Sequence, residues 1–310
     1  TDHMTKDQSM PIRSRLFLAL LALTVTTVSW AQDNPQPSSD KEALKLAALE
    51  ALIAAPPEKA LPLASKVLAG NHSNEVKARA LFVLSQIDDP AAQAQLISVA
   101  EQSGGDLQAD AIRMVGIGGN PDALGRLGEL YRDGDENTRE AVLEAYVIAY
   151  NTQGLYDIAR NAESEAEFED AVELLAALGA RDELRELRDT AGLSRSLIYA
   201  YGITGDVDSL RELALDDSDP EQQAQAIEAL GITGKDDIGA TLVEIYRGSN
   251  SQTVRDAALH GLMIAGDDEA MLQLYRQSQD SAEKRELMQA LAATGSDLIL
   301  EVIDEALANQ

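Results

Sequence analysis

Apolar residues recur along this chain in a pattern that repeats about every 30 residues. The phrase GITG at 202–205 returns at 231–234, and similar phrases occur before and after it. Aligning the chain on the last residue of this phrase gives eight anchor positions: Asp88, Gly119, Tyr150, Gly179, Gly205, Gly234, Gly266 and Gly295. The residues four and seven positions before every anchor are apolar. That spacing places them on one face of an amphipathic helix that ends at the anchor.

A second helix is predicted after each anchor. Leu210 and Leu213 follow Gly205, and Leu242 and Ile245 follow Gly234, again at helical spacing. The anchor is usually glycine, which tolerates the left-handed conformation that ends a helix, and a polar residue such as Asp206 can cap the next helix. GITG is therefore expected to be the turn of a helical hairpin. A phosphate-binding loop is disfavoured because the G-x-G-x-x-G spacing is missing.

Successive hairpins of this kind bury their apolar faces only against one another, which predicts an α-solenoid. The pattern resembles the HEAT repeat family. The resemblance rests on 73–100, 219–247 and 251–276, where pairs such as Val254-Arg255 precede a helix ending in Leu-Gly. It implies an all-α fold, an α-solenoid of about nine helical hairpins in a right-handed superhelix, similar to bacterial HEAT-like repeats of the phycobilin lyase type. Tetratricopeptide repeats fit less well, because their 34-residue period and Trp-Leu-Gly-Tyr signature are not met.

The domain organisation follows from the same pattern. We expect a signal peptide with upstream residues at 1–31, a flexible leader at 32–40, an N-terminal helical hairpin at 41–70 and the repeat array at 73–308. The repeats between Tyr150 and Gly205 depart most from the pattern, so a bend or looser stacking is expected there.

The first 31 residues predict export. Arg13 and Arg15 precede an uncharged apolar run over 16–28, and Ser29 and Ala31 are the small residues expected before a signal-peptidase cut after Ala31. The run is short of the roughly 20 residues that span a bilayer. We therefore expect a periplasmic or secreted protein that is not inserted in the membrane after cleavage. The chain has no cysteine, which suits an oxidising compartment.

The charge limits the partners. The formal net charge is −28, with 53 acidic residues against 25 basic ones. Such a chain repels phosphate backbones and anionic lipids, so nucleic acid is not an expected partner. A protein or peptide partner, which could be basic, is compatible with the charge. The chain is expected to be a monomer.

Motifs for catalysis or metal binding are missing from the sequence. Only His72 and His260 follow the signal segment, and neither H-E-x-x-H nor G-x-S-x-G occurs. The stretch DGDENTREAVLE places Asp133, Asp135, Asn137 and Glu144 at calcium-loop positions, but Thr138 stands where that loop needs glycine. Helix capping by Asp135 and Asn137 explains these residues better. We expect no cofactor, no metal and no enzymatic activity.

Two function classes fit these observations. The first is a non-catalytic scaffold or adaptor that binds a protein or peptide along the concave face of the solenoid. The alternative is an enzyme or enzyme-assisting protein, similar to HEAT-like lyases, with carboxylate-based chemistry. The resemblance implies that the second helices line the concave side. The candidate binding strip consists of the Tyr-Arg pairs that end three of these helices: Tyr131, Arg132, Tyr246, Arg247, Tyr275 and Arg276. Packing of the tyrosines between hairpins is the competing interpretation.

Overall fold

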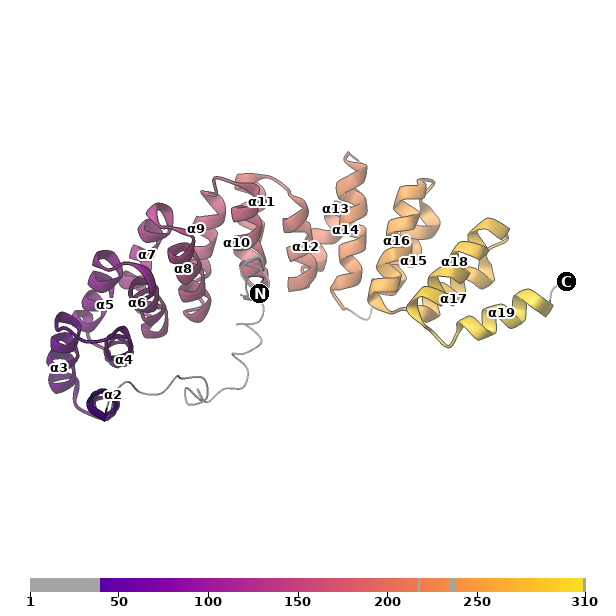
Figure 1. The fold of residues 1–310 in the computed structure, drawn as a ribbon. Helices are drawn as coiled ribbons and strands as arrows, with labels where there is room; N and C mark the ends of the chain where they lie inside the picture. The colour runs from indigo at the N-terminus through magenta and orange to yellow at the C-terminus, as the bar shows by residue number, and fades with distance from the viewer. Residues whose placement is uncertain (1–39, 217, 235–237, 309–310) are drawn as a thin grey trace, which may run out of the picture. The chain divides into compact units, whose positions relative to one another are not determined.

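The computed structural model describes residues 40–216, 218–234 and 238–308, and every regular element within them is an α-helix. The predicted signal segment, and residues 32–39 of the predicted leader, lie outside the described residues. The chain divides into two compact units, Thr1–Ile158 and Ala159–Gln310, and each is described by itself (Figure 1).

Unit 1 is built from α2 (Asp40–Leu52), α3 (Pro57–Ala69), α4 (Asn74–Ser85), α5 (Pro90–Gln102), α6 (Gly105–Gly118), α7 (Pro121–Asp133), α8 (Glu136–Ile148) and most of α9 (Thr152–Arg160). Unit 2 is built from α10 (Glu165–Ala177), α11 (Arg181–Ala191), α12 (Arg195–Thr204), α13 (Val207–Leu215), α14 (Pro220–Ile232), α15 (Ile238–Gly248), α16 (Gln252–Ala265), α17 (Asp268–Gln277), α18 (Ser281–Thr294) and α19 (Ile299–Ala308). The all-α solenoid fold is confirmed.

The predicted turns form at seven of the eight anchors. Backbone φ is positive at Gly119, Tyr150, Gly179, Gly205, Gly234, Gly266 and Gly295. Asp88 is the exception: α4 ends three residues earlier, at Ser85, and Asp89 caps α5 by accepting a hydrogen bond from the amide of Ala91 at 2.7 Å. A glycine anchor reverses the chain without the steric cost that a Cβ would bring.

The residue after the anchor caps the next helix, as expected. The side chain of Asn120 accepts a hydrogen bond from the amide of Ala123 at 3.0 Å, and Asp206 accepts one from Ser209 at 3.4 Å. Asp267 accepts one from the amide of Ala270 at 3.0 Å. These bonds satisfy amides that the first helical turn leaves without partners.

The core follows the predicted apolar positions. All eight residues four positions before an anchor are buried: Leu84, Val115, Tyr146, Leu175, Tyr201, Leu230, Leu262 and Leu291. Seven positions before the anchor the residues are also buried, apart from Met288, which is half-buried. Two stripes on each first helix therefore hold the hairpins together.

The two helices of each hairpin form two layers within each unit. The first layer consists of α4, α6 and α8 in unit 1, and of α10, α12, α14, α16 and α18 in unit 2; the second helices form the other layer. First-layer neighbours pack more extensively on each other than second-layer neighbours do. Small residues allow this close approach: a Cβ built on Gly231 would lie 2.2 Å from the carbonyl oxygen of Gly261.

This difference in spacing corrects one expectation. The first-layer helices of unit 1 approach each other more closely, and unit 1 curves toward its first layer. In both units we call the face formed by the first-layer helices the inner face. In unit 1 the expectation that the second helices line the concave side is therefore wrong, and for unit 2 it stays a prediction. In unit 1, α4, α6 and α8 follow one another along the inner side of the curve in Figure 1. The handedness of the superhelix stays a prediction.

The boundary between the units, after Ile158, falls within the stretch between Tyr150 and Gly205 where the repeats depart from the pattern. Among the described helices, none combines the length and the apolar character needed to cross a membrane.

Candidate functional site

The three tyrosines of the predicted binding strip are buried. The exposed fractions of Tyr131, Tyr246 and Tyr275 are 8%, 3% and 4%. Rings this deeply covered offer almost no area to a partner, which favours the packing interpretation, and the partner-binding strip stays a prediction. Each of the three tyrosines stands two residues before the end of its second-layer helix.

A polar side chain from a later hairpin contacts each ring. The guanidinium of Arg139 lies 5.6 Å from the centroid of the Tyr131 ring, and the ammonium of Lys284 lies 4.9 Å from that of Tyr275. Burial, together with the carboxylate of Glu283 to which it is hydrogen-bonded, raises the pKa of Tyr246. Tyr131 and Tyr275 therefore join consecutive hairpins, and Tyr246 contacts α18.

The arginines of the predicted strip are exposed, and two of them connect neighbouring second-layer helices. Arg247 donates a hydrogen bond to Gln277, and Arg276 forms ion pairs with Glu301 at 2.8 Å and Glu305 at 2.7 Å. Arg132 is exposed, and its carbonyl oxygen accepts a hydrogen bond from Arg139 at 3.4 Å. These contacts lie on the layer opposite to the inner face.

The inner face of unit 2 carries a row of isoleucines that sequence reasoning did not single out. Ile203, Ile232 and Ile264 each stand two residues before an anchor, on α12, α14 and α16. Ile203 is 50% exposed and Ile264 is 42% exposed, while Ile232 is half-buried. Tyr199, 52% exposed, lies one turn before Ile203. We call Tyr199, Ile203, Ile232 and Ile264 the inner apolar row.

Close packing of α12 on α14 makes this row continuous. A Cβ built on Gly202 would lie 3.3 Å from the Cβ of Ile232, so Ile232 sits beside the end of α12. In unit 1 the same position holds Ile117, 40% exposed, on α6, and the half-buried Ile148 on α8. The recurrence of isoleucine two residues before the anchor was the sequence signal for this surface.

Polar residues flank the apolar row one helical turn away. A carboxylate oxygen of Glu228 on α14 is hydrogen-bonded to the Nδ1 atom of His260 on α16, at 3.2 Å. Both stand six residues before an anchor, four residues before Ile232 and Ile264 respectively. In unit 1 the equivalent residues Arg113 and Glu144 form an ion pair. The inner face of unit 2 thus has a line of apolar side chains beside a line that includes a carboxylate.

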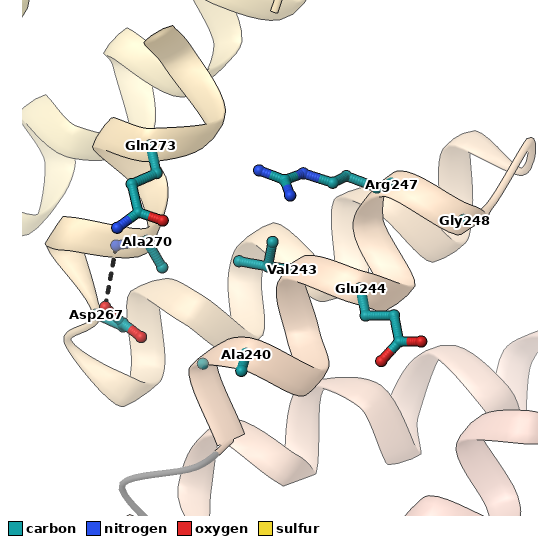
Figure 2. Close-up of a pocket in the computed structure, with 9 residues that line it drawn as sticks. Ala240, Val243, Glu244, Arg247, Gly248, Asp267, Ala270 and Gln273 are labelled. Atoms are coloured by element: carbon teal, nitrogen blue, oxygen red, sulfur yellow. Dashed lines mark hydrogen bonds between the residues drawn. The ribbon is translucent and has the colours of Figure 1, made fainter. Parts of the chain in front are cut away.

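A separate groove opens between α15 and α17 on the second layer of unit 2. It encloses about 680 Å³ and is lined by Gly239, Ala240, Val243, Glu244, Arg247, Gly248, Asp267, Ala270 and Gln273. Figure 2 shows Arg247 extending over the groove toward Gln273, whereas Glu244 points away from Asp267. Small side chains on α15 leave this space open.

The calcium-loop interpretation has no support in the geometry. Asp135 caps α8 by accepting a hydrogen bond from the amide of Thr138 at 2.9 Å, and Glu144 pairs with Arg113. Asn137 lies inside α8 rather than at its cap. Within the described parts of the chain, no three histidine, aspartate or glutamate side chains gather as a metal-ligand group.

Comparison with known proteins agrees with the repeat architecture. The family model for HEAT repeats matches residues 207–295, so this part of the chain carries HEAT repeats. Outside this range the resemblance rests on the same turn and core pattern described above. No curated protein matches the chain.

Two solved structures share coarse features with the chain. The complex of CpcE and CpcF of phycocyanin lyase from Nostoc sp. PCC7120 is 18% identical, with 91% of this chain and 97% of that chain covered and a TM-score of 0.33. A computationally designed self-assembling cyclic homo-oligomer is 16% identical, with 85% and 99% covered and a TM-score of 0.15. At these scores neither likeness bears on function.

Proposed function

We propose that this protein is a non-catalytic scaffold that binds a protein or peptide partner along the inner face of its helical repeats. The inner apolar row carries the proposal. Three isoleucines recur at repeat spacing on helices that are in contact, a tyrosine lies one turn before the first of them, and the row presents apolar side chains to solvent. Aligned apolar residues on a folded surface are typical of interaction sites, and solenoid repeats offer them as one extended surface.

The flanking charge indicates the character of the partner. Glu228 borders the row, and the whole chain has a formal net charge of −28. A partner segment with apolar side chains and neighbouring basic residues would complement this face, because opposite charges steer association and disfavour acidic competitors.

The predicted signal segment supports action in the periplasm or outside the cell. Expression of the complete chain in a bacterial host with an export pathway tests this proposal. We expect the protein in the periplasmic or secreted fraction, with Gln32 at its amino terminus. A cytoplasmic protein that retains Arg13 and Arg15 would contradict it.

Binding is tested by making the inner apolar row polar. The chain from Gln32 onward is used to capture partners from a periplasmic extract, and captured proteins are identified by mass spectrometry. The double variant Ile203→Lys and Ile264→Lys should lose the partner that the unchanged chain captures. Both side chains are 42% exposed or more, so the melting temperature should change little.

The matched control is Leu215→Lys. Leu215 is 80% exposed at the end of α13, on the second layer. This variant adds the same kind of charge away from the inner face and should keep the partner. Equal loss in the control and the double variant, or full retention in both, would argue against binding on the inner face.

A further inference from the structure

Arginine side chains bridge neighbouring second-layer helices at several places in unit 2. Arg188 of α11 pairs with Glu212 of α13 at 3.0 Å, and Arg211 of α13 donates to the hydroxyl of Thr241 of α15 at 3.4 Å. Because second-layer helices are more widely spaced, a long side chain fills the gap between them and satisfies polar groups on the next helix. The spaces between second-layer helices are thus filled in several places by arginine side chains of the chain itself.

The most complete bridge joins Arg185 of α11 to Asp206, the cap of α13. The Nε and Nη2 atoms of Arg185 donate to the two carboxylate oxygens of Asp206, both at 2.7 Å. The Asp206 side chain is only 2% exposed. Its carboxylate also accepts a hydrogen bond from the hydroxyl of Ser209 at 2.8 Å. Planar, two-bond pairing of this kind suits guanidinium and carboxylate geometry.

Asp267 has the same local structure two hairpins later. It follows an anchor glycine and caps α17, and its backbone angles of φ −88° and ψ 68° match the −82° and 72° of Asp206. Its Oδ1 atom accepts the amide of Ala270, as Asp206 accepts that of Ser209. Of the described residues, only Ala270 donates a hydrogen bond to the side-chain carboxylate of Asp267.

The residue facing Asp267 is Gly239, and the next residue, Ala240, stands at the position that Arg185 has in α11. Arg185 stands six residues after the anchor Gly179, and Ala240 stands six residues after the anchor Gly234. A Cβ built on Gly239 would lie 1.7 Å from the Oδ2 atom of Asp267. The absence of a side chain at this position lets the carboxylate lie against α15, at the edge of the open groove.

The groove has a carboxylate and apolar walls like those that surround an arginine bridge between helices, but no arginine of α15 occupies the position of Arg185. Asp267 lies at one side of the groove, and Ala240, Val243 and Ala270 provide apolar surface along which an alkyl stem can pack (Figure 2). Arg247, a cation that lines the groove, is hydrogen-bonded to Gln277.

We propose that the groove between α15 and α17 is a second contact site, which binds an arginine side chain of a partner protein through the carboxylate of Asp267. Arg185 with Asp206 is the internal template for this pair. The site lies on the layer opposite to the inner apolar row, so it goes beyond the proposed function and is tested separately.

The test uses the chain from Gln32 onward and the probe peptide acetyl-Gly-Arg-Gly-amide. Binding is followed through the backbone amide resonances of Gly239 and Ala270. The matched probe replaces arginine with citrulline, which has nearly the same size and keeps the Nε donor and one terminal NH2 group, but has a carbonyl oxygen in place of the other nitrogen and no charge. We expect saturable shifts with the arginine peptide and little response to the citrulline peptide.

Asp267→Asn separates the charge from the fold, because asparagine also caps helices well. This variant should bind the arginine peptide about tenfold more weakly, the effect expected from losing a charge-assisted bond. Glu244→Gln, on the same groove but pointing away from Asp267, should bind it within about twofold of the unchanged chain, because surface charges act weakly at this range. Equal binding of both peptides, or unchanged binding by Asp267→Asn, would overturn the proposal.

Lys235 precedes α15 and lies outside the described residues, so Lys235→Ala is included. If only this variant binds the arginine peptide, Lys235 blocks the groove in the unchanged chain, and the proposal for a partner arginine is wrong. The inner-face double variant should bind the arginine peptide normally. A failure of the groove therefore leaves the inner-face proposal intact.

Discussion

The guanidinium of Arg139 lies 5.6 Å from the centroid of the buried Tyr131 ring, which joins the end of α7 to the start of α8. The Nε atom of Arg139 also donates to the carbonyl oxygen of Tyr131 at 3.2 Å. Lys284 and Tyr275 are arranged the same way between α17 and α18. At both places a basic residue near the start of a first helix contacts the tyrosine near the end of the preceding second helix, and this contact connects the two hairpins.

Tyr131→Ala should destabilise the protein by about 3 kcal/mol, because it removes a buried aromatic side chain and leaves a cavity. Arg132→Ala, one residue further on, should change the free energy of unfolding by less than about 0.5 kcal/mol, since Arg132 is exposed. Urea denaturation of both variants measures the difference. Unchanged stability of Tyr131→Ala with lost partner binding would restore the tyrosine to a binding role.

The Arg185–Asp206 pair predicts an acid-dependent loss of stability. Burial opposes ionisation of Asp206, but hydrogen bonds from Arg185 and Ser209 outweigh it and hold its pKa below the usual value of 3.8. A depressed folded-state pKa stabilises the protein above the unfolded-state pKa of about 3.9, and this stabilisation is lost as the pH falls through the folded-state value.

The measurement compares the urea midpoint of the unchanged chain with that of Asp206→Asn between pH 6 and pH 3. Asparagine keeps the helix cap, so the difference at pH 6 reports mainly the charged pair. We expect this difference to shrink steadily below about pH 4. A difference that is independent of pH would show that the charge of Asp206 does not contribute.

Tyr150 is the anchor where the repeat pattern lacks glycine, and it pays a conformational cost. Its φ is 52°, in the left-handed region that a residue with a Cβ avoids, and its side chain is 76% exposed. Tyr150→Gly should therefore stabilise the protein by about 1 kcal/mol, because strain is relieved with little loss of packing. A lower melting temperature of Tyr150→Gly would show that its ring packs on a neighbour.

The turns and the core could be predicted from the sequence because both depend on local spacing. Gly234 has a positive φ since glycine at that position ends α14, and Leu230, four residues earlier, is buried for the same helical reason. The burial of the tyrosines in the Tyr-Arg pairs could not be predicted from the repeat spacing. Tyr246 is buried and is hydrogen-bonded to Glu283 of α18, and the repeat spacing does not predict that contact.

The choice of the inner layer had a sequence signal that the repeat alignment already contained. Gly202 and Gly231 each stand three residues before an anchor, where a first helix touches the next one. Glycine inside a helix lowers helix propensity, so its recurrence there indicates close contact between backbones. The same reasoning identifies Ile203 and Ile232, the next residues along, as the side chains at the edge of that contact.

Gly234→Ala should destabilise the protein by about 1 kcal/mol through the backbone alone. Its φ is 62°, and a Cβ there would meet no heavy atom within 4 Å. Gly125 in α7 also has open space around a Cβ, but it has no positive φ. Gly125→Ala should therefore stabilise the protein by about 0.5 to 1 kcal/mol. Urea denaturation measures the change in the free energy of unfolding for both variants. Changes of opposite sign would confirm the turn at Gly234, and changes of the same sign would contradict it.

Gly231→Ala tests the close packing of the first layer. Its Cβ would lie 2.2 Å from the carbonyl oxygen of Gly261, which is backbone and cannot turn away. The helices α14 and α16 must then separate, and we expect a loss of about 2 kcal/mol or more, the range for overpacked cores. The loss should exceed that of Gly234→Ala, although the residue is helical and alanine favours helices. Separation of α14 from α16 should also disturb the inner apolar row, so partner capture should weaken at temperatures where the variant is still folded. A variant as stable as the unchanged chain would show that the first layer is not the tightly packed one, and would place the inner face elsewhere.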